Sequence, residues 1–188
     1  MDVYGVYKGV RNAAWQCLID HKITALPVDL IRIAAESGVV IRKNSDVHEL
    51  YGRESGACIL HNGQWYLIYD DACVVGRRRF TIAHELGHIF LGHELINGRH
   101  GRSFDARNPQ SETDADVFAS RLLAPACVLW ALDIRTADEI SKVCGISDAA
   151  AKIRANRMRV LYDRQKFLTS PLERRVLEQF KAFILKNK

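Results

Sequence analysis

The chain has 188 residues, of which 48% are hydrophobic and 26% are charged, and its formal net charge is +5. This length suits one globular domain, or one with a small appendage, and the composition excludes a disordered chain. No run of about 18 apolar residues occurs, so we expect no membrane span. The mild, scattered positive charge does not favour nucleic-acid binding, although direct binding stays open.

Five cysteines are spread along the chain, at Cys17, Cys58, Cys73, Cys127 and Cys144. No two of them form a Cys-x-x-Cys pair, which excludes a thiolate zinc knuckle and a thioredoxin-type motif. The odd number, and an N-terminus without a basic segment followed by an apolar run, are typical of a reducing compartment. We therefore expect a cytoplasmic protein with unpaired cysteines.

The first part of the chain predicts two helices and a small sheet. Apolar residues at helical spacing predict an amphipathic helix in the first 22 residues. Leu26-Pro27-Val28-Asp29 opens a second helix with proline in its first turn, and Gly38 ends it. Strand-like runs follow at residues 39–41, 57–60 and 64–69. The last two flank Asn62-Gly63, a pair that favours a hairpin turn.

The pattern then becomes helical and remains so to the end. The candidate helices cover residues 77–92, 111–124, 136–144, 147–160 and 171–186. The last begins at Ser170-Pro171-Leu172-Glu173, which supplies an N-cap, a proline at the first helical position and a glutamate at the third. The expected fold is therefore α+β, with a small antiparallel sheet near the middle of the chain.

The segment His84-Glu85-Leu86-Gly87-His88 lies within the predicted helix 77–92. Residues four apart on a helix lie about 40° apart around the axis and about one turn apart along it, so both imidazoles can bind one metal ion. Glu85 lies where its carboxylate can reach a water molecule on that metal without being a ligand. The alternative is a surface helix with solvated histidines. Apolar residues nearly all round this helix favour burial instead, and buried histidines and glutamate need partners.

A catalytic zinc needs three protein ligands and one open position. A third histidine ten residues after the first is excluded, because Glu94 occupies that position and His93 is out of register. The acidic candidates downstream are Glu94, Asp105, Glu112, Asp114 and Asp116. Helical projection places Glu112 and Asp116 on an apolar stripe and Asp114 on the opposite side. Inward-facing carboxylates need a cation or a hydrogen-bond partner.

The simplest assignment makes Glu112 the third metal ligand. Asp116, one turn later, would then accept a hydrogen bond from a ring N–H of a ligating histidine and fix its tautomer. The alternative is a carboxylate placed near the helix N-terminus at Ser111 by the helix dipole. That alternative explains Glu112 but not Asp116.

Two motifs, in this order, resemble the ImmA/IrrE family of metallopeptidases. They are Phe80-Thr81-Ile82-Ala83-His84-Glu85-Leu86-Gly87-His88-Ile89-Phe90-Leu91-Gly92-His93 and Glu112-Thr113-Asp114-Ala115-Asp116-Val117-Phe118-Ala119-Ser120-Arg121-Leu122-Leu123-Ala124-Pro125. The resemblance covers roughly residues 25–125, and Ala124 stands where the family usually has methionine. It implies a minimal zincin core of gluzincin type, with zinc, or alternatively manganese, held by His84, His88 and Glu112. Glu85 would be the catalytic base.

The resemblance also implies a substrate that residue spacing cannot show. Family members are similar to anti-repressors that cut a helix-turn-helix transcriptional repressor of a prophage, an integrative element or a DNA-damage response. The hairpin at 57–69 could offer an edge strand to an extended substrate segment. Tyr66, Tyr69 and His93 are candidates for stabilising the transition state, while ordinary strand or loop roles stay open for each of them.

Residues 136–160 suggest a competing class of function. Thr136 and Glu139 form a capping box, and Gly145 joins two predicted helices in a pattern that resembles a helix-turn-helix. The basic residues that could then contact phosphates are Lys152, Arg154, Arg157 and Arg159. Such glycine-joined helix pairs also occur as simple packing or substrate-docking appendages.

We therefore predict a zinc metallopeptidase core over residues 1–130 and a helical extension over residues 131–188. The alternative is a DNA-binding or repressor-sequestering regulator that keeps the metal fold without cleaving.

Overall fold

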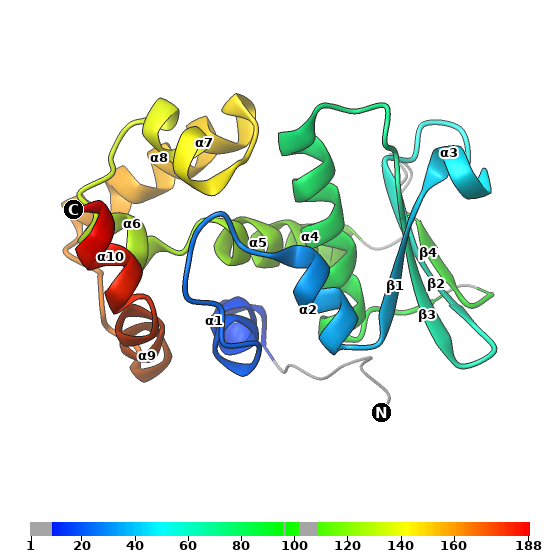
Figure 1. Cartoon of the computed structure of the whole chain (residues 1–188), viewed down its shortest axis with the longest axis horizontal. Coiled ribbons are helices and arrows are strands. Elements are labelled where there is room, and N and C mark those ends of the chain that lie inside the picture. Colours follow the sequence, from blue (N-terminus) through cyan, green and yellow to red (C-terminus); the bar gives the residue numbers. More distant parts are fainter. Residues whose placement is uncertain (1–8, 96, 102–108) are drawn as a thin grey trace.

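The computed structural model describes residues 9–95, 97–101 and 109–188, and it has the predicted α+β class with a helical C-terminal extension (Figure 1). The described strands are β1 (Val39–Lys43), β2 (Gly56–His61), β3 (Gln64–Tyr69) and β4 (Arg99–Gly101). The described helices are α1 (Val10–Asp20), α2 (Leu30–Glu36), α3 (Asn44–Val47), α4 (Val75–Leu91), α5 (Pro109–Leu123), α6 (Ala126–Ala131), α7 (Ala137–Cys144), α8 (Asp148–Asp163), α9 (Pro171–Gln179) and α10 (Lys181–Asn187). The start of the helix predicted in the first 22 residues lies outside the described part.

In the described part of the chain the strands form one sheet in the order β1-β3-β2-β4. β2 and β3 make the predicted antiparallel hairpin, and its turn places Asn62 and Gly63 at φ 49° and 76°. β4 pairs antiparallel with β2, whereas β1 pairs parallel with β3. The sheet is thus mixed rather than wholly antiparallel, because β1 reaches β3 through a crossover that passes through α3 and β2.

The hairpin lies inside the sheet, since β2 and β3 each have a neighbour on both sides. The expectation that the hairpin offers an edge strand is therefore wrong. The free edge of β2 is covered by β4, whose residues Arg99, His100 and Gly101 pair with Ile59, Cys58 and Ala57. Three residues are too few to show a strand periodicity, which is why sequence analysis did not predict β4.

The helix ends differ from the predictions in two places. α2 begins at Leu30, and Asp29 caps it by accepting a hydrogen bond from the Arg32 N–H at 3.0 Å. Pro27 therefore precedes the helix and does not lie in its first turn. The helix predicted over 171–186 is divided into α9 and α10 at Phe180, whose side chain is fully buried.

α4 packs against β2 and β3 on one side and against α5 on another. The approach of α4 to α5 is close at Gly87, where an added β-carbon would lie 3.1 Å from Phe118 Cδ1 and 3.3 Å from Ala115 Cα. Leu86, Ile89 and Phe118 belong to the hydrophobic core around this contact. With a β-carbon here the neighbouring atoms would have to move by a few tenths of an ångström, so glycine favours the close approach of the two helices. This approach sets the distance between the residues that they carry.

The C-terminal helices pack on the same core. The α7–α8 turn, with Gly145 at φ 63°, lies against the start of α4, so that an added β-carbon at Gly76 would lie 2.5 Å from the backbone nitrogen of Ser147. Residues on both sides of the predicted boundary at 130 share one hydrophobic cluster, for example Leu86 and Ile140. Among the described residues, no helix is long and apolar enough to cross a membrane.

Candidate metal centre

The helix α4 carries three polar side chains into the interior. His84, Glu85 and His88 are each 0% exposed, and the stretch Thr81–Phe90 is buried throughout. This burial excludes the alternative of a surface helix with solvated histidines. A buried polar side chain needs a hydrogen-bond or charge partner, so the neighbours of these three residues decide what the site can do.

The two histidines and a glutamate from α5 converge on one point. His84 Nε2 lies 2.9 Å from His88 Nε2, and Glu112 approaches both rings, with Oε2 3.3 Å from His84 Nε2 and Oε1 3.4 Å from His88 Nε2. One ligand atom from each of the three residues falls within 4.8 Å of the others. The structure thus brings together the three residues for which the sequence analysis predicted metal binding.

This donor set fits a divalent metal ion. Two imidazole nitrogens and one carboxylate oxygen are a ligand combination that zinc prefers in catalytic sites. These three ligand atoms direct their lone pairs at one buried point, and a cation at that point would bind all three. The histidines come from successive turns of α4 and the carboxylate from the next helix, so the α4–α5 contact at Gly87 sets the spacing of the site.

Asp116 lies one turn after Glu112 on α5. Its Oδ1 atom is 2.8 Å from His84 Nδ1, on the side of the ring opposite to the ligand nitrogen Nε2. A carboxylate accepts but does not donate, so His84 Nδ1 carries the proton and Nε2 presents its lone pair. This contact therefore sets the tautomer that metal binding requires.

Glu85 lies between α4 and β2. An added β-carbon at Gly56, the first residue of β2, would overlap with the Thr81 methyl group and lie 3.0 Å from Glu85 Oε1, so glycine at this position leaves room for both side chains. Burial raises the pKa of the nearby Cys58 thiol, and the charge of Glu85 raises it further. Cys58 is therefore a neutral thiol at neutral pH.

Two further histidines surround His88. His93, just after α4, has its Nδ1 atom 2.8 Å from His88 Nδ1. His100 on β4 places its ring centroid 3.7 Å from that of His88, and its Nε2 lies 3.9 Å from Glu112 Oε1. Burial lowers the pKa of both His93 and His100, which favours neutral rings at pH 7. No pattern in the sequence pointed to His100, because the three residues of β4 are too few to show one.

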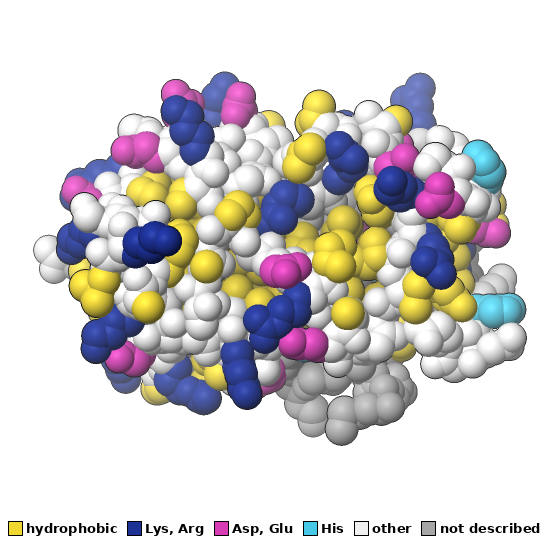
Figure 2. Space-filling view, in the orientation of Figure 1, with side chains coloured by type: hydrophobic (Ala, Val, Ile, Leu, Met, Phe, Trp, Pro, Cys, Tyr) yellow, Lys and Arg dark blue, Asp and Glu magenta, His cyan; other side chains and the backbone are white. Residues whose placement is uncertain are grey.

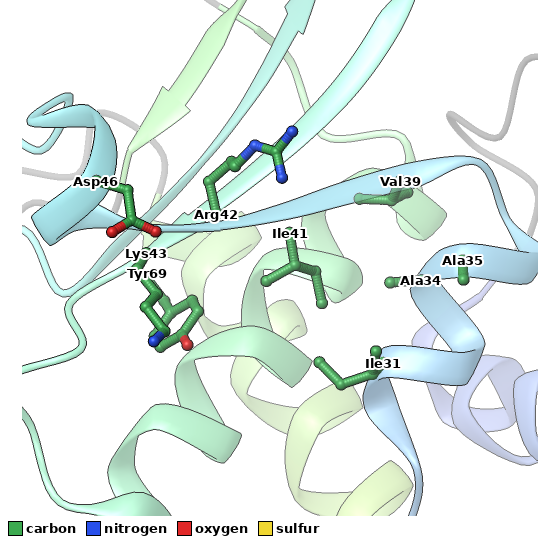
Figure 3. A pocket seen from close by; sticks show the side chains of 9 residues that line it. All are labelled: Ile31, Ala34, Ala35, Val39, Ile41, Arg42, Lys43, Asp46 and Tyr69. Atoms are coloured by element: carbon green, nitrogen blue, oxygen red, sulfur yellow. The ribbon is translucent and has the colours of Figure 1, made fainter.

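The two tyrosine candidates both lie on β3. Tyr69 lines a groove of about 370 Å³ between α2 and β1, together with Lys43 and Asp46 (Figure 3). Tyr66 alternates with the core residue Leu67 and so faces the opposite side of the sheet. The structure thus brings His93 next to His88 and turns Tyr66 toward the other face of the sheet.

The remaining acidic residues from the list of third-ligand candidates do not join the described site. Glu94 is exposed, and Asp114 accepts a hydrogen bond from Gln110 at 2.7 Å. Asp105 lies outside the described residues.

Of the four basic residues that the helix-turn-helix alternative offered to phosphates, one is buried. Arg154 is only 5% exposed, and burial lowers its pKa to about 10, with Arg121 and Arg157 contributing to the shift. Arg154 therefore points into the protein rather than toward a phosphate, while Lys152, Arg157 and Arg159 are exposed. On the face shown in Figure 2, Lys and Arg side chains are dispersed among Asp and Glu.

A histidine pair on one helix, a glutamate between them and a carboxylate from the following helix define a site of the metallopeptidase class. The chain belongs to the Peptidase_M78 family, described as the IrrE N-terminal-like domain, whose sequence model matches residues 34–156, more than half of the chain. The match includes the whole site and continues through α7 into α8, past the predicted boundary at residue 130. Comparisons with curated proteins and with solved structures give no significant match.

Proposed function

We propose that this protein is a zinc-dependent endopeptidase that cleaves a helix-turn-helix transcriptional repressor and thereby acts as an anti-repressor. The observation that carries the peptidase part is the convergence of His84, His88 and Glu112, with Glu85 buried beside them. The repressor as substrate is supported by the resemblance of the two motifs to ImmA/IrrE proteins.

Each residue of the site has a separate task. His84, His88 and Glu112 would hold the metal, and Asp116 keeps a proton on His84 Nδ1 so that Nε2 remains a ligand. When bound, zinc supplies a Lewis acid that polarises the scissile carbonyl and lowers the pKa of a water molecule toward about 7. Glu85 takes the proton from the attacking water and delivers it to the leaving amine. The packing of α4 against β2 keeps bulk water from this carboxylate.

The test is incubation of the zinc-loaded protein with the helix-turn-helix repressor encoded nearest its gene, followed by mass spectrometry. Wild type should give defined fragments. Glu85→Gln should keep stoichiometric zinc and give none, whereas His84→Ala and Glu112→Ala should lose the metal. Full cleavage by Glu85→Gln would overturn the mechanism. A parallel sample loaded with manganese identifies the metal that supports activity.

The exposed Lys152, Arg157 and Arg159 of α8 keep one second function open, that of a DNA-binding regulator. DNA binding would appear as a salt-dependent mobility shift that survives Glu85→Gln and weakens on Arg157→Ala. Stoichiometric binding of the repressor without fragments would instead indicate a sequestering regulator.

A further inference from the structure

The active-site helix α4 ends in a Schellman motif. Gly92 has φ 74° and ψ 40°, the left-handed conformation, and its N–H donates to Ile89 O at 3.3 Å. The next N–H, that of His93, donates to His88 O at 3.1 Å. This pair of hydrogen bonds folds the chain back over the last turn and sets the side chains of the residues at its two ends side by side. The end of the helix therefore places His93 next to His88, which lies five residues earlier in the chain.

The resulting contact is a hydrogen bond between two imidazoles, with His93 Nδ1 and His88 Nδ1 2.8 Å apart. One of the two nitrogens must donate and the other must accept. When His88 Nε2 uses its lone pair for a metal, the proton of the neutral ring is on Nδ1. His93 Nδ1 must then be the acceptor, and its own proton is on Nε2.

The two ligating histidines thus have different acceptors behind them. The Nδ1 atom of His84 donates to the carboxylate of Asp116, whereas the Nδ1 atom of His88 donates to the neutral ring of His93. Both acceptors hold the orientation of a ligand, but only the carboxylate adds negative charge to the site. Glu112 already brings one negative charge to the metal position. A neutral acceptor behind His88 leaves more of the cation's charge available to polarise a substrate carbonyl.

We propose that His93 is a positioning residue that fixes the tautomer and orientation of His88, and that it does so as a neutral acceptor. This inference rests on the proposed metal-dependent function. It replaces the transition-state role considered for His93 in the sequence analysis, because its Nδ1 atom faces the side of His88 opposite to the ligand nitrogen.

Two matched substitutions test the hydrogen bond. In His93→Asn the amide oxygen occupies the position of Nδ1, so the neutral acceptor is retained, whereas His93→Leu keeps a similar branched shape without an acceptor. Zinc affinity, measured by competition with a fluorescent chelator, should fall about 10- to 100-fold in His93→Leu and stay close to wild type in His93→Asn. His61→Leu, at the exposed last residue of β2, is the control and should bind zinc like wild type.

Ring nitrogen NMR of the zinc-loaded protein gives a second measurement. It should show a proton on His88 Nδ1 and on His93 Nε2. Equal zinc affinity of wild type and His93→Leu, or a proton on His93 Nδ1, would overturn the inference while leaving the metal site intact. Absence of zinc binding by wild type would instead overturn the proposed function. Circular dichroism of each variant without metal separates loss of affinity from loss of fold.

Discussion

The contact between the α7–α8 turn and the start of α4 can be tested at Gly76. In Gly76→Ala, the new β-carbon would lie 2.5 Å from Ser147 N and 2.7 Å from Ile146 C. Carbon atoms pack at about 3.5–4.0 Å, and backbone atoms cannot move away by changing a rotamer, so the whole turn must shift. Overpacking of this kind costs about 1–3 kcal/mol, against at most about 1 kcal/mol gained from replacing glycine by alanine in a helix.

With an overpacking cost of about 2 kcal/mol, the middle of that range, the net destabilisation is about 1–2 kcal/mol. In a protein of this size this lowers Tm by roughly 2–8 °C. Differential scanning calorimetry of the metal-free protein measures it. Val75→Ala is the control, because Val75 lies in the same helical turn, is 60% exposed and should change Tm little. A Tm for Gly76→Ala at or above that of wild type would refute the reasoning that the C-terminal helices are packed tightly on the active-site helix.

Three further predictions concern the site and its surroundings. Asp116→Asn should weaken zinc binding about 10-fold or more in a chelator competition, because an amide can present a donor where the ligand histidine needs an acceptor; unchanged affinity would contradict this. Burial raises the pKa of Cys127 and Cys144 to about 12, so the unfolded chain loses these protons first as pH rises. The free energy of unfolding should therefore be fully retained below about pH 8.5 and fall above it, by up to about 1.4 kcal/mol per pH unit and thiol, until the folded pKa is reached. Urea titrations between pH 8 and 10 should show a smaller fall for Cys127→Ala than for wild type, and equal slopes would argue against it. Gly56→Ala should reduce peptide cleavage more than zinc affinity, since the added methyl group presses on Thr81 and Glu85 and not on the ligands; a proportional loss of both would show a general disruption instead.

Several features of this protein follow from local sequence alone. The α-helical repeat places His84 and His88 on one face whatever the helix packs against, and the same repeat groups Glu112 with Asp116. The Asn62-Gly63 turn is equally local, because its positive φ angles are a property of those two residues. The apolar residues on nearly all sides of the helix 77–92 also predicted its burial, since such a helix is stable only in an interior.

Other features depend on which elements meet in space. β4 pairs with β2 on the edge that β3 leaves open, and this pairing places His100 at the site. Arg154, which the helix-turn-helix alternative made available to phosphates, is buried, because helical spacing says which residues share a face but not which face is covered. The parallel pairing of β1 with β3 likewise joins segments that are distant in the chain.

The contact of His93 with His88 is a tertiary feature that a local rule could nevertheless have predicted. Gly92, the sequence neighbour of His93, predicts a helix end, and the spacing from His88 is the spacing that a Schellman motif brings together, so a local rule could have found the contact. What the sequence by itself determined is therefore the residues of the candidate metal site and their order along helices, because helical geometry is set by the backbone. Only the tertiary structure decided how far apart α4 and α5 stand and which side chains surround His88, because those distances depend on packing between elements far apart in the chain.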